Sequence, residues 1–165
     1  MANVEVGYQR TTIVFPQNTK GILLGMKKRG FGEGWWNGFG GKLLNNESYE
    51  DSARRETLEE VGLHISNLLH LANLHFYFDG ALGVVSRAYS CDFTGEPAET
   101  EEMRPQLFQP NQLPFNDMWP ADRLWIPKVL SDTANYPLGF IIHFNGDKTF
   151  KSMNEVEAIQ LEGKF

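Results

Sequence analysis

The sequence has 165 residues, of which 41% are hydrophobic, and this size suits one domain with its own core better than two domains. Its net charge of −6 argues against a surface for a nucleic-acid polymer, although a small anionic nucleotide can still bind where a divalent metal supplies positive charge. The single cysteine, Cys91, excludes a disulfide framework, and no apolar run approaches the roughly 20 residues that span a membrane.

The first ten residues, MANVEVGYQR, lack the apolar core of a signal peptide and the arginine-rich character of a transit peptide. Together with the lone cysteine, this predicts a soluble protein of a reducing compartment. We expect a cytoplasmic location, with nuclear and mitochondrial locations left open, and a monomer without a membrane partner.

The first third of the chain predicts two strands and a glycine-rich loop. Residues 8–15 are rich in β-branched and aromatic side chains, residues 16–21 form a turn, and residues 22–28 return as a second strand. Residues 29–42, RGFGEGWWNGFGGK, suit either a flexible connector or a backbone that lies close to a flat ligand. We favour the second interpretation, because this loop leads directly into an acidic helix.

That helix is predicted over residues 49–61. Ser48, followed three residues later by Asp51, resembles a helix-start capping pair, and Gly62 is a suitable stop.

The second half predicts more strands than helices. Residues 68–78 alternate apolar and polar side chains, the Asp79-Gly80 pair indicates a hairpin, and residues 82–93 form its second strand. An acidic loop follows over residues 94–104, and residues 107–108 suit a short strand.

The remaining elements end the chain with a second hairpin. Residues 121–130 predict a short helix limited by Pro127, and residues 138–144 predict a strand. Asn145-Gly146 indicates a turn, and residues 148–161 a last strand. Strands before and after a central helix indicate an α+β fold, a layered sheet packed between helices.

Three carboxylates, those of Glu56, Glu59 and Glu60, fall on one face of the predicted helix. Like charges at this spacing repel by a few tenths of a kcal/mol, and acids near a helix C-terminus oppose its dipole by roughly 0.3–1 kcal/mol each. The face is therefore either solvated, with Arg54 and Arg55 as partial neutralisers, or a cation site. The glycine pair before the helix, which lets a backbone approach a ligand closely, favours the cation site.

The same stretch resembles the Nudix box, G-x5-E-x7-R-E-U-x-E-E-x-G-U, at every fixed position. The matching residues are Gly41, Glu47, Arg55, Glu56, Glu59, Glu60 and Gly62. Thr57 stands where an aliphatic residue is usual, which we expect to affect packing more than chemistry. The resemblance implies a Mg²⁺-dependent hydrolase with a mixed β-sheet sandwiched between α-helices, in one domain over residues 1–165.

Four stretches are similar to the vertebrate-type oxidised purine nucleoside triphosphatases, a Nudix subfamily. They are LLGMKKRGFGEGWWNGFGGK, EEMRP, PFNDMWPADRLW and FNGD, which begin at Leu23, Glu101, Pro114 and Phe144. The resemblance implies hydrolysis of 8-oxo-dGTP and 2-hydroxy-dATP to the monophosphate and pyrophosphate, which sanitises the nucleotide pool and so serves DNA repair.

The resemblance also implies a substrate-binding set, carried over by position. Its members are Thr12, Lys27, Phe31, Asn37, Phe39, Gly40, Gly41, Lys42, Phe76, Met103, Trp119, Asp122 and Phe144. Trp119 offers a stacking face, worth roughly 1–3 kcal/mol per base. Asn37 can donate and accept, and Asp122 can accept from the base. Thr12, Phe76 and Phe144 are equally compatible with plain core packing.

The implied metal ligands are oxygens that suit Mg²⁺, with Mn²⁺ as a substitute. They come from Gly40, Glu56, Glu59, Glu60 and Glu102. Only the EEMRP match selects Glu102 among the acids of its loop. We expect Glu60 to be the general base, with Glu59 or Glu102 as alternatives, and Arg55 to orient a box glutamate through a bidentate pair.

One departure from the subfamily bears on substrate choice. Adjacent aspartates follow the Trp-Pro pair in the subfamily, whereas here Ala121 takes the first place and Asp122 remains. Two neighbouring carboxyls can share a proton and exchange donor and acceptor roles, which a single one cannot. We therefore expect narrower or weaker recognition of oxidised purines.

Three alternatives come from other functional classes. A Nudix hydrolase for ADP-ribose or an unmodified nucleotide would share the box but would not need the pocket of Asn37, Trp119 and Asp122. A non-catalytic Nudix binding module usually loses box acids, and all are present here. A non-enzymatic acidic interaction helix leaves the glycine pair and the distal matches unexplained.

Overall fold

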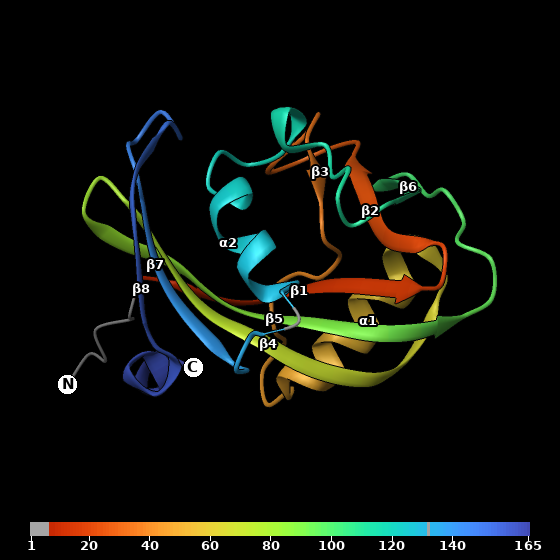
Figure 1. Ribbon diagram of the computed structural model, residues 1–165, viewed down its shortest axis with the longest axis horizontal. Coiled ribbons are helices and arrows are strands. Elements are labelled where there is room, and N and C mark those ends of the chain that lie inside the picture. Colours follow the sequence, from red (N-terminus) through yellow and green to blue (C-terminus); the bar gives the residue numbers. More distant parts are fainter. Residues whose placement is uncertain (1–6, 132) are drawn as a thin grey trace.

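The computed structural model describes residues 7–131 and 133–165, whose strands form one eight-stranded mixed sheet with helices on both faces (Figure 1). The predicted α+β class is thereby confirmed. Residues 1–6, which form most of the segment predicted to carry no leader, and residue 132 lie outside the described residues. None of the helices in the described part of the chain is long and apolar enough to cross a membrane.

The strands follow the spatial order β3-β2-β1-β5-β4-β7-β8, and β6, which lies outside this order, also pairs with β2. Their bounds are β1 Gln9–Asn18, β2 Gly21–Lys27, β3 Trp36–Asn37, β4 His64–Phe78, β5 Ala81–Thr94, β6 Met103–Phe108, β7 Leu138–Phe144 and β8 Phe150–Glu157. β1 is parallel to β5 and β4 is parallel to β7, and the other neighbours are antiparallel.

Helix α1, Tyr49–Val61, begins and ends where the sequence predicts. The Ser48 hydroxyl accepts the backbone N–H of Asp51 at 3.0 Å, which satisfies one of the free donors of the first turn. Gly62 ends the helix in the left-handed conformation at φ 72°, which glycine adopts without steric cost. Thr57 is fully buried, and its hydroxyl donates to the Ala53 carbonyl at 2.7 Å, so the unusual polar residue in this slot is satisfied inside the helix.

The two α-helices cover opposite faces of the sheet (Figure 1). Helix α2, Asp122–Val129, packs Trp125 and Val129 into a cluster with the β4 residues Ala72 and Leu74, as the predicted alternation of that strand requires. The buried side of α1 packs into a second cluster, with Val14, Leu63 and Tyr89. The site residues are therefore divided between the two faces and the loops at their edge.

Several predicted boundaries differ from the structure. The last strand ends at Glu157 rather than at residue 161, because Ala158 and Leu161, three residues apart, both point into the protein from a 3-10 helix, η2, Ala158–Lys164. β6 begins at Met103, inside the predicted loop, because it pairs with β2 along its whole length. The two-residue strand β3 and the 3-10 helix η1, Phe115–Asp117, were not predicted.

Candidate active site

Glu60 occupies the most buried position of the carboxylate cluster on α1. It is 1% exposed, and its Oε1 accepts the backbone N–H of Gly40 at 2.7 Å. Its Oε2 is buried and has no hydrogen-bond partner among the described residues. Burial raises the pKa of Glu60 to about 8, and the Lys27 charge opposes this rise while the charges of Glu56 and Glu102 add to it. One buried oxygen is thus left for a cation or a proton.

Arg55 holds the outer part of the cluster. Its Nε and Nη2 donate to the two carboxylate oxygens of Glu47 at 2.8 and 2.9 Å, a bidentate ion pair. Its Nη1 donates to Glu56 at 2.9 Å and to Glu59 at 3.3 Å. The expected bidentate pair with a box glutamate is therefore present in the structure, with Glu47 as the partner.

The acidic loop before β6 is tied to the end of α1 by Thr100. The Thr100 hydroxyl donates to the Glu60 carbonyl at 2.7 Å and accepts the backbone N–H of Glu102 at 3.3 Å. This anchor brings Glu102 to the carboxylate cluster from a position 42 residues further along the chain than Glu60.

The glycine pair before α1 lies against the cluster too tightly for any side chain. A Cβ at Gly40, whose φ is 127°, would lie 2.1 Å from the Thr12 carbonyl oxygen, and a Cβ at Gly41 would lie 2.8 Å from the Glu56 carboxyl carbon. The backbone of this loop can therefore approach a ligand held by the carboxylates.

The predicted metal ligands are close to one another but are not arranged as a metal site. Across residues 7–131 and 133–165, no three His, Cys, Asp or Glu side chains are placed to hold a metal ion. Glu59 pairs with Arg55, and Glu102 pairs with Arg29 at 3.4 Å. The oxygen donors and the unpartnered Glu60 Oε2 fit a hard divalent cation, provided that Glu59 and Glu102 leave their arginine partners.

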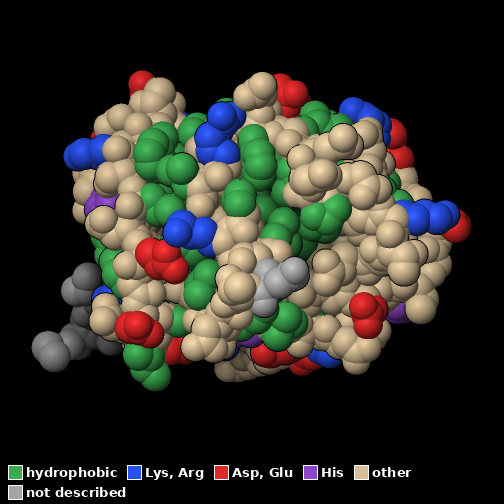
Figure 2. All heavy atoms as spheres, in the orientation of Figure 1, with side chains coloured by type: hydrophobic (Ala, Val, Ile, Leu, Met, Phe, Trp, Pro, Cys, Tyr) green, Lys and Arg blue, Asp and Glu red, His purple; other side chains and the backbone are tan. Residues whose placement is uncertain are grey.

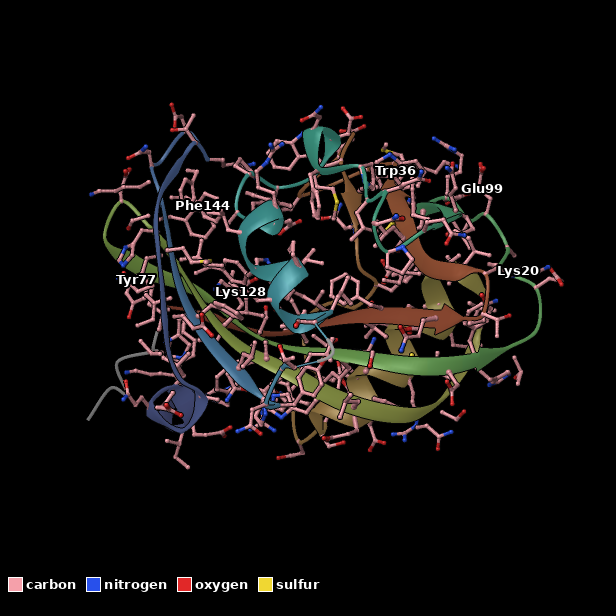
Figure 3. All side chains as sticks on the ribbon, in the orientation of Figure 1. Lys20, Trp36, Tyr77, Glu99, Lys128 and Phe144 are labelled. Carbon is pink, nitrogen blue, oxygen red and sulfur yellow. The ribbon has the colours of Figure 1, made fainter. Side chains whose placement is uncertain are left out.

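An aromatic group forms the second part of the site, on the face of the sheet that α2 covers. Trp119 lies 5.0 Å from Phe31, 4.6 Å from Trp35 and 5.5 Å from Phe144, measured between ring centroids. Phe144 stands near the end of β7 on the side of α2 (Figure 3) and stacks on Phe76 at 6.4 Å. Hydrophobic side chains gather on this face of the molecule (Figure 2).

Two polar side chains lie beside this aromatic group. A Cβ at Gly32 would lie 3.4 Å from the Trp119 ring nitrogen and 3.6 Å from the Asn37 amide nitrogen, so loop and ring are in close contact. Asp122 begins α2, and its Oδ1 accepts the Trp125 ring N–H at 3.0 Å. Burial raises the pKa of Asp122 to about 7, against the lowering effect of that hydrogen bond.

Lys27 connects the two parts. Its backbone N–H donates to the Trp35 carbonyl at 3.1 Å, and its carbonyl accepts from Gly34 at 2.9 Å, so it borders the aromatic loop. Its charge meanwhile acts on Glu60.

Two of the predicted substrate residues have buried side chains. Phe39 and Met103 are 0% and 2% exposed and pack in the cluster beneath α1, whereas Trp119 packs against the cluster on the other face. Their apolar side chains pack in the core, and the Phe39 backbone pairs with Val14. Their contact with a substrate stays a prediction.

Three other predicted residues lie at the glycine pair rather than in the aromatic group. Thr12 is 3% exposed, and its hydroxyl accepts the Gly41 N–H at 3.5 Å. The Lys42 carbonyl accepts from Arg55 at 3.1 Å. Gly40 bonds to Glu60, so all three serve the carboxylate side of the site.

The predicted site set omitted Glu47 and Thr100. The box match already pointed to Glu47, but the pairing of its carboxylate with Arg55 depends on the fold of the preceding loop. Thr100 carries no local signal, because its bonds join segments 40 residues apart.

Glu47→Gln is expected to lower the free energy of unfolding by about 1–3 kcal/mol at neutral pH, because it breaks a hydrogen-bonded ion pair that is only 11% exposed on the Glu47 side. Arg55 lowers the pKa of Glu47 from 4.5 to about 2. Since the pKa of Glu47 is lower in the folded than in the unfolded state, the ion pair stabilises the protein fully above about pH 4.5. This stabilisation is lost as the pH falls towards 2.

Urea unfolding at pH 7 and pH 3 measures the difference in the free energy of unfolding between the native protein and Glu47→Gln. This difference should be smaller at pH 3. Glu101→Gln, at an 89% exposed side chain, should change the free energy of unfolding little at either pH. An equal loss for Glu47→Gln at both pH values would contradict the ion-pair account.

Comparison with known proteins assigns the class. Residues 7–129 match the NUDIX domain family model, and the chain belongs to the Nudix family of hydrolases. It is 48% identical over 121 residues to the mouse oxidized purine nucleoside triphosphate hydrolase, an alignment that covers 72% of this chain and 78% of the relative. The zebrafish protein of the same name is 47% identical with the same coverage.

Solved structures support the same fold. The crystal structure of the MutT protein from Bacillus halodurans superposes with a TM-score of 0.73, covering 89% of this chain and 97% of that one. At 23% sequence identity, this similarity is evidence for a shared fold and for nothing further.

Proposed function

We propose that this protein hydrolyses oxidised purine nucleoside triphosphates to the monophosphate and pyrophosphate in a Mg²⁺-dependent reaction and so sanitises the nucleotide pool. The observation that carries the proposal is that Lys27 bonds through its backbone to the aromatic loop while its charge acts on Glu60 of the carboxylate cluster. The names of the mouse and zebrafish relatives support the same substrate class.

The carboxylate cluster suits the triphosphate end of such a substrate. Glu56, Glu59, Glu60 and Glu102, with the Gly40 carbonyl, would hold Mg²⁺, or Mn²⁺ in its place. When bound, the ion would neutralise phosphate charge and make a coordinated water easier to deprotonate. Lys27 adds a positive charge beside the cluster, and Arg55 keeps Glu56 oriented.

The reaction itself needs a base for water. The water oxygen bonds to a phosphorus, the phosphoanhydride bond between nucleoside monophosphate and pyrophosphate breaks, and the water proton leaves to a base. We assign that base to Glu60, because its buried Oε2 has no hydrogen-bond partner among the described residues and can take a proton. Glu59, which is more exposed, and Glu102 are the alternatives.

The aromatic group suits the base. A purine ring can stack on Trp119, while the amide of Asn37 and the free oxygen of Asp122 meet its polar edge. Trp125 occupies one Asp122 oxygen and so fixes the plane of the carboxyl group. Ala121, in the place of the subfamily's first aspartate, is fully buried in the core cluster beneath α2. The pocket therefore depends on one carboxyl group, which is the basis for proposing narrower recognition.

The preference between oxidised purines is expected to depend on pH, because the pKa of Asp122 is raised to about 7. Below that value the protonated carboxyl group donates to an acceptor nitrogen, as on an adenine-type edge. Above it the carboxylate accepts from the N–H groups of an oxoguanine edge. The ratio of kcat/KM for 8-oxo-dGTP to that for 2-hydroxy-dATP should therefore rise from about pH 6 to pH 8.

Parallel assays of Asp122→Asn provide the control, since an amide does not titrate in this range and its ratio should stay level. A pH-independent ratio in the native protein would contradict the role given to Asp122.

A nucleotide screen tests the proposed function. Pyrophosphate release is measured for 8-oxo-dGTP, 2-hydroxy-dATP, the four unmodified triphosphates and ADP-ribose, with Mg²⁺ and with EDTA. The proposal expects the oxidised purines to give the highest kcat/KM, only when Mg²⁺ is present. Faster turnover of ADP-ribose or an unmodified nucleotide would favour the alternative Nudix substrate class.

Two further parts of the proposal concern the state of the protein in the cell. We propose a cytoplasmic monomer, supported by the buried Cys91 thiol, whose pKa burial raises to about 12 and which is therefore unreactive. Light scattering on a sizing column and microscopy of the tagged protein test the two statements. A dimer mass or an exclusively organellar signal would contradict them.

A further inference from the structure

The hairpin between β7 and β8 is fixed to the neighbouring turn between β4 and β5. The Asp79 carboxylate accepts the Gly146 N–H at 2.7 Å, and the Asp79 N–H donates to the Phe144 carbonyl at 3.0 Å. A Cβ at Gly146 would lie 2.2 Å from the Asp79 carboxylate, so the two turns are in direct contact. The hairpin that follows the pocket residue Phe144 is therefore held in one place.

Lys148 projects from this hairpin to the aromatic group. Its backbone adopts the left-handed conformation at φ 68°, and its N–H donates to the Asn145 carbonyl at 2.9 Å. Its Nζ lies 4.5 Å from the centroid of the Phe31 ring and 6.0 Å from that of Trp119. Both distances are within the range in which an ammonium is attracted to an aromatic face.

Phe31 lies in an exposed part of the glycine-rich loop. Gly30 and Gly32, on either side, have φ values of 79° and 86°, a conformation that suits glycine. The ring is 60% exposed and packs against Trp119 at 5.0 Å with a tilt of 33°. At that separation no base fits between the two rings, so Phe31 packs against Trp119 without a ligand between them.

We propose that Lys148 is a positioning residue of the base pocket. Its ammonium holds the Phe31 ring against the Trp119 ring. This contact keeps Trp119 in the orientation that a purine needs for stacking. The hairpin anchored by Asp79 and the glycine-rich loop, more than 100 residues apart in sequence, are joined at this contact. The inference rests on the proposed function for its substrate but not for the contact itself.

The first arm of the test uses the substrate. Lys148→Met is expected to raise KM for 8-oxo-dGTP about two- to fivefold with kcat unchanged, the size of an exposed cation–π contact. Lys148→Arg should stay near the native value, since a guanidinium also binds an aromatic face. Lys151→Met, which removes the same charge from exposed β8, should have no effect.

A double-mutant cycle separates the contact from simple charge attraction to the triphosphate. In a Phe31→Leu background, Lys148→Met should no longer change KM, because the ring that Lys148 orients is gone. An effect of full size in that background, an unchanged or lowered KM in Lys148→Met alone, or an equal effect of Lys151→Met would overturn the proposal.

The second arm needs no substrate. Hydrogen exchange of the Glu33, Gly34 and Trp35 amides, which bond to Gly30, Lys27 and Gly32, reports on the loop in the free protein. Lys148→Met should speed this exchange about two- to fivefold, and Lys148→Arg should exchange at about the native rate. Faster exchange in a protein that releases no pyrophosphate would refute the proposed function and support the contact, whereas unchanged exchange would overturn the contact.

Discussion

Glu60→Gln is expected to lower kcat for pyrophosphate release by about 10²- to 10⁴-fold, the usual contribution of a general base. The amide oxygen of glutamine can still accept the Gly40 N–H, so the glycine loop should keep its place. What the variant loses is the negative charge and the ability to take a proton, at an oxygen that has no partner among the described residues. The loss should therefore appear in kcat rather than in the folding of the protein.

Stability measurements in EDTA check that the variant is folded. Because the folded-state pKa of Glu60 is raised to about 8, its ionisation opposes folding, and native stability should fall as the pH rises from about 4.5 to 8. Glu60→Gln should lack this part of the pH dependence and be no less stable than the native protein at pH 8.

Glu59→Gln and Glu102→Gln decide between the candidate bases. Each removes one carboxylate that pairs with an arginine at the edge of the cluster. Near-normal turnover in Glu60→Gln, combined with a 10²-fold or larger loss in one of the other two, would move the role of base to that residue.

Trp119→Ala should raise KM for oxidised purine triphosphates about 5- to 150-fold, which corresponds to the roughly 1–3 kcal/mol that one stacked base contributes. The substitution removes the ring that joins Phe31, Trp35 and Phe144. Trp119→Phe keeps an aromatic face, so its KM should lie between those of the native protein and Trp119→Ala. Since stacking grows with ring size, the loss should be larger for purine than for pyrimidine nucleotides.

Trp36→Phe, in strand β3, is the control for a general loss of aromatic packing near the site. Trp36 is 7% exposed, packs on Phe108 at 4.9 Å and lies under the Arg104 guanidinium (its position is labelled in Figure 3). Trp36→Phe should lower the free energy of unfolding without changing the preference for purine over pyrimidine nucleotides. Equal KM effects of Trp119→Ala on purines and pyrimidines would contradict a stacking role.

The limits of helix α1 were predictable because their signals are local. Ser48 and Gly62 act on backbone groups within four residues, and the structure places both as the sequence indicates. The hairpin turns at Asp79-Gly80 and Asn145-Gly146 are local in the same sense. The end of β8 was not predictable in this way, because the turn into η2 is set by burial of Ala158 and Leu161 against distant strands.

In the candidate site, too, local features were predictable from the sequence and long-range contacts were not. The box places Glu56, Glu59 and Glu60 on one helix, but sequence spacing does not say that Glu60 turns inward while Glu59 pairs with Arg55. Phe39 and Met103 were assigned to the substrate by position, and their burial follows only from packing of the sheet against α1. Lys148 has no signal in the sequence, since its contact with Phe31 joins a hairpin and a loop that are remote along the chain.

The central claim is that a divalent ion, bound together with the nucleotide, neutralises the carboxylates of α1. Calorimetric titration of Mg²⁺ into the protein with a non-hydrolysable 8-oxo-dGTP analogue measures this directly, with Glu56→Gln and Glu101→Gln as the test and control variants. We predict saturable Mg²⁺ uptake by the native protein and Glu101→Gln, and strongly weakened uptake with loss of pyrophosphate release in Glu56→Gln. No uptake by the native protein in the presence of the analogue, or intact pyrophosphate release by Glu56→Gln, would contradict the account.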